Sequence, residues 1–490
     1  MILTALVAVA VLAVDPPEWV VRLEKPTEGS AFAIAADGLR FAVARDTNWI
    51  DIYYRGEVEN SVRCNDGDRV VALAFTDNGK SLAAGCQHSN QLRIWDVMGG
   101  QQRLAVTTKT EGIRAIAFHP REASAYCGGS NGTICAVDLR TGVERFALPE
   151  PSTAIGYNFN FAMCFHPSGR MLACGSSRHD IGHFWNLHDR TQDLEFPMSS
   201  SSQSRPSLAF DRTGRMLLIV RPNSVVVRET ASRGRRWYRD IQGATKGATW
   251  SDDGRFIAVA SDAGLVEILD GEAGTVVASH VRFGTCDAIA AAGGKLVTPG
   301  ADQTVRFLHW PKAGAPRPDL KGRTIDPNDI RNANLEVVYR TMQLLQTDPA
   351  LVVRLAMTQL EPIPTLSVDR KAEVSKSVAR LAHDDFDIRQ SASQKLRELA
   401  PTAGLEIRRA AAKEIDPEAL YRLRQLLADA TIPKSEPLVT VAQARYLELL
   451  ERINTPAART VVERLTKGDP DAELTLDAID TLARMNRDRK

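Results

Sequence analysis

This sequence lacks most of what would indicate an enzyme, a metal protein or a nucleic-acid-binding protein. Its 61 Lys and Arg residues are offset by 60 Asp and Glu residues, so a net charge of +1 gives no electrostatic footprint for a polyanion. It contains no phosphate-cradling Gly-Lys-Ser/Thr loop, no paired metal-binding histidine motif on a helix and no nucleophile elbow. We therefore assign no catalytic residue, no metal ligand and no cofactor, and we do not expect a nucleic-acid partner.

Cysteine is also scarce. Seven cysteines in 490 residues are too few for a disulfide scaffold, and a free cysteine in a predicted strand serves as a small apolar residue. Two pairs flank hairpin turns and could face each other across adjacent strands, namely Cys164 with Cys174 and Cys127 with Cys135. Cross-strand bridges are geometrically demanding, so free thiols are favoured and the disulfide state of both pairs stays open.

An apolar run long enough to cross a membrane is missing. Residues 2–14 are continuously apolar, but about 13 residues are too few to span a hydrocarbon core of roughly 30 Å, and they match the core of a signal peptide. Val11-Leu12-Ala13 offers a small-residue cleavage site, although no Lys or Arg precedes the run. We therefore predict that residues 1–14 direct export, with residues 1–13 removed, and that the protein is exported or periplasmic. The alternatives are a retained apolar N-terminal segment and a cytoplasmic protein.

What the sequence does contain is a repeat. Seven stretches share the pattern seen most clearly in VVALAFTDNGKSLAAGCQHSNQLRIWDVMGG, which predicts three short strands joined by two turns. Their spacing of roughly 40 to 45 residues is the period of a four-stranded propeller blade. The copies begin near Ala31, Val70, Ile113, Phe161, Pro206, Lys246 and Cys286. Aligning the first turns, which carry a glycine in every copy except the third, where Glu122 stands, places the following residues at one inner position: Ile34, Phe75, Phe118, Phe165, Phe210, Trp250 and Ala290.

Residues 19–310 resemble the WD-repeat family of β-propellers. Trp95-Asp96 matches the naming dipeptide, whereas the other copies keep it only in part, and the turn aspartate survives mainly as Asp262 and Asp302. The polar network of well-kept repeats is therefore incomplete, so blade packing must depend more on apolar contacts. We assign no catalytic role to the two His-Pro pairs of the turns, His119-Pro120 and His166-Pro167.

Closure of such a ring requires one blade to combine both ends of the repeat region. The seventh copy ends at residues 305–310 without an outer strand, while residues 19–24 precede the first copy without a blade of their own. Because an open sheet edge invites aggregation, we predict that these two segments pair.

The composition changes after residue 311. Residues 312–326 are rich in Pro, Gly and Arg and indicate a linker, and residues 327–490 show helical periodicity with nearly balanced charge, which we interpret as a solvated helical surface. A capping side chain beside a proline or an acidic first turn predicts helix starts at Asp348-Pro349, Asp384-Asp385, Asp416-Pro417 and Thr455-Pro456. One apolar stripe predicts a helix that packs on a neighbour through Phe386, Ile388, Ala392, Leu396 and Leu399.

The tail resembles the HEAT-like helical module that follows WD repeats in a family of bacterial proteins. The resemblance is carried by VVYRTMQLLQTDPALVVRLAMTQL, VARLAHDDFDIRQSASQKLREL and LLERINTPAARTVVERLTKGDP. It implies a multidomain β plus α protein, with a seven-bladed WD-type propeller over residues 15–311 followed by an all-α helical-repeat domain over residues 327–490. The implied function is a non-enzymatic scaffold or adaptor for protein partners; the alternative is a propeller enzyme or small-ligand sensor with its site at the central channel mouth.

Loops on a rigid scaffold commonly carry recognition, and here the turns between the second and third strands differ most between copies. Arg and Trp dominate interface hot spots, so the predicted partner-binding residues are Trp49, His88, Arg178, His179 and Arg221. The alternative is that these side chains only cap the ends of the blades. Two histidines of one cluster in the fourth copy could in principle bind a metal. A structural role is favoured, because His179 and Asp180 lie in a predicted turn and His183 lies on the predicted strand that follows. The cluster consists of Arg178, His179, Asp180, His183 and His188.

Overall fold

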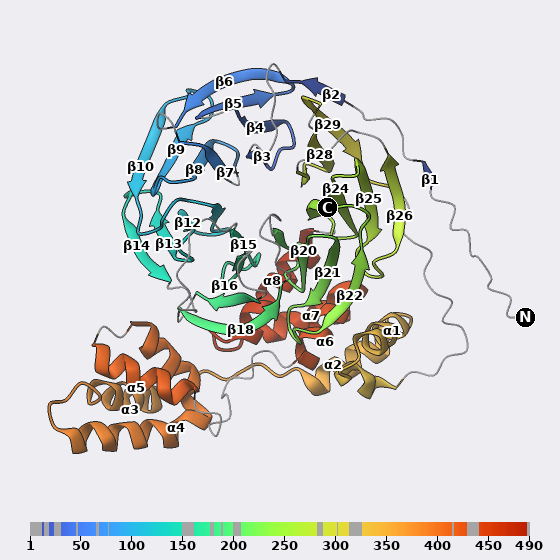
Figure 1. The fold of residues 1–490 in the computed structure, drawn as a ribbon. Coiled ribbons are helices and arrows are strands. Elements are labelled where there is room, and N and C mark those ends of the chain that lie inside the picture. Colours follow the sequence, from blue (N-terminus) through green and yellow to red (C-terminus); the bar gives the residue numbers. More distant parts are fainter. Residues whose placement is uncertain are drawn as a thin grey trace, which may run out of the picture. The chain divides into compact units, whose positions relative to one another are not determined.

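The computed structural model divides the chain almost entirely into two compact units, one ending at Arg317 and the other beginning at Pro318. Figure 1 shows the first as a ring of β-sheets and the second as a set of helices. The structure describes residues 12–13, 19–23, 31–45, 48–64, 68–76, 78–148, 161–176, 181–187, 190–198, 207–281, 288–300, 302–312, 326–413, 416–428 and 441–487.

The first unit is a propeller of seven sheets, each with four strands in radial order. The first four blades run from the innermost to the outermost strand as β3 (Phe32–Ile34), β4 (Arg40–Ala44), β5 (Trp49–Tyr54) and β6 (Glu57–Arg63); β7 (Val70–Phe75), β8 (Ser81–Cys86), β9 (Gln91–Asp96) and β10 (Gln102–Thr107); β11 (Ala115–Phe118), β12 (Ser124–Gly128), β13 (Ile134–Asp138) and β14 (Glu144–Leu148); and β15 (Phe161–Phe165), β16 (Met171–Ser176), β17 (Ile181–Asn186) and β18 (Thr191–Pro197).

The remaining blades are β19 (Ser207–Phe210), β20 (Met216–Arg221), β21 (Ser224–Glu229) and β22 (Arg235–Asp240); β23 (Thr245–Trp250), β24 (Phe256–Ser261), β25 (Leu265–Asp270) and β26 (Val276–Val281); and β27 (Ala290–Ala292), β28 (Lys295–Gly300), β29 (Thr304–His309) and β2 (Trp19–Arg22). A short segment, β1 (Leu12–Ala13), runs parallel to β26 at the outer edge of the sixth blade. Each copy therefore has a fourth, outer strand beyond the three that the repeat pattern predicts.

The two ends of the repeat region close the ring, as the sequence predicts. β2 pairs antiparallel with β29, and Val21 lies opposite Val305 in this register. The Leu23 N–H extends the ladder by donating to the Gln303 carbonyl at 2.8 Å. The seventh blade is thus built from both ends of the propeller sequence.

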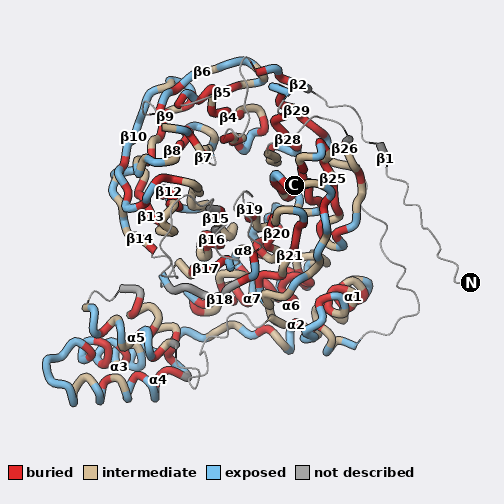
Figure 2. Tube along the Cα trace, viewed as in Figure 1, coloured by how far each residue is buried: buried red, intermediate tan, exposed pale blue. Residues whose placement is uncertain are grey.

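Apolar clusters fill the contacts between neighbouring blades. The innermost strands touch in a closed series, from β3 through β7, β11, β15, β19 and β23 to β27 and back to β3. Seven clusters of buried residues each combine side chains from two adjacent blades. Figure 2 shows buried positions mainly along the second and third strands of the blades and mostly exposed or intermediate positions on the outermost strands. Packing between the blades is therefore mainly apolar, as the incomplete polar signature predicts.

The predicted hairpin glycines also join neighbouring blades. Gly214, at φ +78°, lies against the His166 ring of the preceding blade, so a Cβ there would overlap that ring. Gly169 lies against His119 in the same way, and the His119 Nε2 bonds the Gly169 carbonyl at 2.9 Å. The His119 and His166 rings therefore pack between the turns of consecutive blades, which is a structural role that the repeat alignment did not suggest.

The cysteine registers differ between the two predicted pairs. Cys127 lies directly opposite Cys135 on neighbouring strands, as predicted. Cys164 instead lies opposite Ala173, and Cys174 lies opposite Met163. Because successive residues of a strand point to opposite faces, Cys164 and Cys174 face away from each other, and that predicted pairing is wrong. The six cysteines that the structure describes are all free thiols.

The second unit contains a short 3-10 helix and eight α-helices within the described residues: η1 (Pro327–Arg331), α1 (Leu335–Leu345), α2 (Pro349–Gln359), α3 (Val368–Ala379), α4 (Phe386–Lys413), α5 (Pro417–Ala428), α6 (Val441–Ile453), α7 (Pro456–Leu465) and α8 (Glu473–Arg487). The four predicted helix starts are those of α2, α4, α5 and α7. The side chain of Asp348 caps α2, that of Asp416 caps α5 and that of Thr455 caps α7.

These helices form two packed groups. α3, α4 and α5 share one buried core that includes Ala392, Leu396 and Leu399 from the predicted stripe. α2 packs on α6 and α7, and α8 packs on both of these helices, so the group of α3 to α5 is inserted between chain-distant neighbours. Phe386 departs from the predicted stripe: it is 57% exposed at the first residue of α4, with the Arg389 and Arg422 guanidinium groups 5.7 and 5.9 Å from its ring centre.

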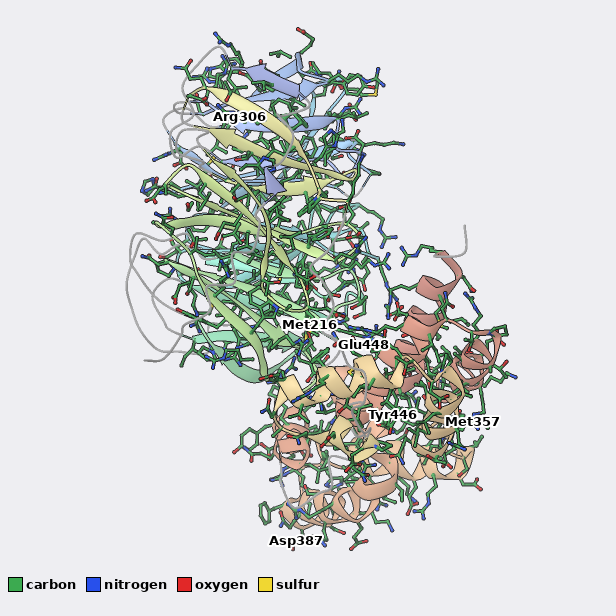
Figure 3. The ribbon with its side chains drawn as sticks, turned by 90° about the vertical axis from the view of Figure 1, so that its right-hand side faces the viewer. Met216, Arg306, Met357, Asp387, Tyr446 and Glu448 are labelled. Carbon is green, nitrogen blue, oxygen red and sulfur yellow. The ribbon has the colours of Figure 1, made fainter. Side chains whose placement is uncertain are left out.

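Several arginines of this unit are internal, which corrects the interpretation of its charge as a solvated surface. Arg445 is 1% exposed and donates from Nη1 to the Ile330 carbonyl at 2.6 Å. Arg464 donates to the Leu360 carbonyl, at the end of α2, at 2.8 Å. Arg484 donates two hydrogen bonds to the Glu451 carboxylate, at 2.8 and 3.0 Å. Tyr446 and Glu448 on α6 are buried as well (Figure 3). Such charged donors satisfy carbonyls that a helix end leaves unpaired.

Candidate functional site

The predicted binding residues within the described part of the chain lie where the second strand of a blade connects to the third. Trp49 begins β5, His88 lies between β8 and β9, and Arg221 ends β20. Arg178 and His179 lie outside the described residues. The linkers that enter each blade meet the same connections: Asp68, just before β7, accepts from the Ser89 N–H at 2.7 Å, and Asp262 accepts from the Ala244 N–H, just before β23, at 2.7 Å. Connections of both kinds therefore share one face of the propeller.

Trp49 is the best organised of these residues. Its side chain is 40% exposed, yet the Arg45 and Arg63 guanidinium groups lie 5.5 and 5.6 Å from the centre of its ring. The turn is closed by the Arg45 N–H, which donates to the Trp49 carbonyl at 2.7 Å. An exposed indole is thus held between two cations, each of which is attracted by the face of the ring.

One of these cations is itself fixed by the blade. Arg45 Nη2 lies 2.6 Å from the Asp51 Oδ1, and the Ser61 hydroxyl donates to the same oxygen at 2.6 Å. Asp51 is 8% exposed. The carboxylate therefore holds the guanidinium in place beside Trp49, because charge-assisted hydrogen bonds are the stronger ones.

Sequence reasoning missed Arg63, which stands directly opposite Trp49 in the ladder of β5 and β6. The repeat period implies a fourth, outer strand in each blade, but the repeat alignment covers only three strands, so no residues were assigned to the strand that carries Arg63. The glycine turn at Arg55-Gly56, directly after the strand of Trp49, is the signal that would have found it.

The other two described candidates have partners within the fold. His88 Nδ1 lies 3.4 Å from the Asp68 Oδ1, and the imidazole is 73% exposed. Arg221 Nη2 donates to the Pro197 carbonyl of the neighbouring blade at 3.1 Å. Arg221 thus joins two blades, which is the capping role named as the alternative, whereas His88 presents its ring to solvent.

Elsewhere in the described part of the propeller, charged side chains gather in ion-pair clusters, such as Arg40 with Asp37 and Glu59. No group of three His, Cys, Asp or Glu side chains with metal-binding geometry occurs among the described residues. His183 lies on β17, as predicted, and faces Cys174 across the ladder; Asp180 and His188 lie outside the described residues. Burial lowers the pKa of His119 and of His280, which keeps both imidazoles neutral near pH 7.

Comparison with known proteins agrees with this architecture. Residues 56–96 match the family described as "WD domain, G-beta repeat", and this match runs from the turn before β6 to the end of β9, so it joins the outer strand of one blade to three strands of the next. Human WD repeat-containing protein 90 is 26% identical over 222 residues, which is 42% of this chain and 12% of that protein. The chain thus spans only a small part of this curated relative.

A solved structure extends the likeness to the whole ring. The β-propeller domain of Cps50 (Swd1) from Myceliophteria thermophila superimposes with a TM-score of 0.51 over 60% of this chain and 99% of that domain, at 14% sequence identity. Likeness at this level shows the fold alone. The chain therefore carries a WD40 repeat within a seven-bladed propeller, followed by a helical region, and none of the described helices is long and apolar enough to cross a membrane.

Proposed function

We propose that this protein is a non-enzymatic scaffold for protein partners, and that one partner docks on the propeller face around Trp49. The observation that carries the proposal is the exposed Trp49 ring held between Arg45 and Arg63. An indole that is already fixed loses little side-chain freedom when it becomes buried. Trp and Arg are also the residue types that most often dominate binding energy in interfaces.

The centre of the ring favours a scaffold over the alternative of an enzyme or small-ligand sensor. Catalysis needs titratable groups that converge in one pocket. In the seven innermost strands that the structure describes, Lys246 is the only Lys, Arg, His, Asp or Glu residue. Side chains from these strands are otherwise apolar or small and neutral, so they supply no acid and base pair.

The helical unit would provide a second contact surface, and we extend the proposal to a HEAT-like role for it. Phe386 and Tyr421 are 57% and 59% exposed on α4 and α5, and Arg422 bonds Glu418 at 2.6 Å beside them. Exposed aromatic residues with a fixed arginine have the composition of a partner surface. A propeller and a helical surface in one chain suit a protein that bridges two macromolecules.

Export remains part of the proposal, with cleavage after Ala13. Residues 1–11 lie outside the described part of the chain. Amino-terminal sequencing of the native protein should give a start at residue 14. An intact Met1 on protein from the cytosol would contradict export.

The docking proposal is tested with two matched variants of the full chain. Trp49→Ala removes the ring from the proposed surface, and Tyr238→Ala removes a ring that is 44% exposed on β22. Proteins captured from native extract by the wild type are identified by mass spectrometry, and the binding of the purified partner is then measured by calorimetry. We expect the Trp49→Ala variant to weaken binding at least tenfold, as loss of a hot-spot residue does, and the Tyr238→Ala variant to bind normally. Equal affinity of both variants would move the site away from Trp49.

A further inference from the structure

Two buried thiols from neighbouring blades meet inside the propeller. Cys64 follows β6, the outer strand of the first blade, and Cys86 ends β8 in the second blade. Both belong to the apolar cluster between these blades and are 6% and 2% exposed. A side-chain hydrogen bond joins the two thiols, so the two side chains are in direct contact within this cluster.

The backbone holds both cysteines in place. The Cys64 N–H donates to the Asn48 carbonyl at 2.8 Å, and the Cys86 carbonyl accepts from the Ile113 N–H at 3.0 Å. Cys86 also lies opposite Val70 in the ladder of β7 and β8. The backbone of Cys64 is therefore fixed within the first blade, and that of Cys86 is fixed by the second blade and by the segment that enters the third.

We propose that Cys64 and Cys86 are a site of oxidative modification, and that they form a disulfide linking the first and second blades when the chain folds in the presence of a small-molecule disulfide such as oxidised glutathione. One protein thiolate attacks the small disulfide, forms a mixed disulfide and releases one small thiol. The second protein thiolate then attacks the protein sulfur of the mixed disulfide and releases the other small thiol. Two protein thiols are oxidised to one disulfide, and the small disulfide is reduced to two thiols.

The fold explains when this reaction takes place. The hydrogen bond with Cys64, together with burial, raises the pKa of the Cys86 thiol, and a thiol that stays protonated is a poor nucleophile. The folded protein therefore resists oxidation, and the bond forms while the interface between the blades is still open. Once formed, it limits the freedom of the unfolded chain and so stabilises the propeller.

The other described cysteines do not offer the same link. Cys127 and Cys135 face each other within one blade, where the ladder already joins the two strands. Cys164 and Cys174 lie on opposite faces of one sheet. Among the described cysteines, the pair of Cys64 and Cys86 is thus the one that joins two blades.

The test uses the full-length wild type, unfolded in reductant and refolded with a glutathione buffer. After alkylation and digestion without reductant, mass spectrometry should detect a linked peptide pair containing Cys64 and Cys86. The oxidised protein should melt roughly 5 °C above the same protein refolded in reductant. Native-like protein that lacks the linked pair, or that contains it without a rise in Tm, overturns the proposal.

Variants assign the effect to this pair. The double variant Cys64→Ala/Cys86→Ala should have the same Tm in both buffers, whereas Cys127→Ala, at another buried cysteine, should keep the difference between them. A redox-dependent Tm that persists in the double variant overturns the assignment. If the double variant does not fold, the linked peptide and the two melting temperatures of the wild type still decide the question.

Discussion

Val21 lies directly opposite Val305, and this pair joins β2, which precedes the first blade in the sequence, to β29, the last strand of the propeller in the sequence. Val21 is buried in the cluster between the seventh and first blades, whereas its neighbour Val20 is 43% exposed. Substitutions at these two adjacent residues can therefore distinguish the contribution of apolar packing from that of strand pairing.

We expect Val21→Asp to destabilise the propeller by about 3 kcal/mol or more, because it places an unpaired carboxylate in an apolar cluster. Val20→Asp, on the solvent side of the same strand, should change stability by no more than about 0.5 kcal/mol. Tryptophan fluorescence during urea unfolding measures both, since all seven tryptophans precede residue 311. Equal losses in the two variants would contradict the observed face of β2.

A second prediction concerns the glycines of the hairpin turns. Gly214→Ala and Gly294→Ala place a Cβ at nearly the same backbone conformation, φ +78° and +74°, but only the first Cβ would meet the His166 ring; the second would meet nothing within 4 Å. We expect Gly294→Ala to cost about 1 kcal/mol from backbone strain, and Gly214→Ala to cost about 1–3 kcal/mol more from overpacking. Melting temperatures of the two variants test this order. If Gly214→Ala lowers the melting temperature no more than Gly294→Ala does, the His166 ring can move aside and the prediction is wrong.

The buried histidines make stability depend on pH. His119 Nδ1 accepts from the Arg121 and Glu122 N–H groups at 3.1 and 2.9 Å, so the proton lies on Nε2, which donates to the Gly169 carbonyl. Burial lowers the pKa of His119, and the unfolded chain takes up a proton near pH 6.5, before the folded protein does. The free energy of unfolding should therefore fall as the pH drops below about 6.5 and level off below the folded pKa.

Removing this histidine should reduce that pH dependence. His119→Asn keeps a turn acceptor but no titratable group, so its free energy of unfolding should decline less steeply with acid than that of the wild type. His280, whose pKa burial also lowers, adds a slope of the same sign in both proteins. Urea unfolding between about pH 7.5 and pH 5 measures the difference, and parallel curves would contradict a role for His119.

The last prediction concerns the arginines inside the helical unit. Arg445→Ala should destabilise this unit by about 3 kcal/mol, because it leaves the Ile330 carbonyl without its charged donor and opens a cavity. Arg370→Ala is the control, since its ion pair with Glu373 is half-exposed and is expected to contribute less than about 1 kcal/mol. Ellipticity at 222 nm reports the helices, while fluorescence reports the propeller. If the two variants lose the same stability, the buried Arg445 contributes no more to the helical unit than the exposed Arg370 does.

The sequence by itself determined the parts of the fold that repeat. A period of turn glycines and apolar strands indicated the ring of blades, the unpaired segments at residues 19–24 and 305–310 indicated its closure, and capping side chains marked the helix starts. These features depend on neighbours within a few residues or on a count of strands, so a single chain carries them.

Only the tertiary structure decided which distant side chains meet. Arg63 lies beside Trp49 on an outer strand to which the repeat alignment assigns no residues, Cys64 meets Cys86 between two blades, and Arg445 binds a carbonyl more than a hundred residues away. For the same reason, the predictions that Phe386 packs on a neighbouring helix and that Cys164 faces Cys174 were wrong. Spacing along the chain specifies a face of an element, whereas contact between elements depends on register and packing, which the local pattern does not encode.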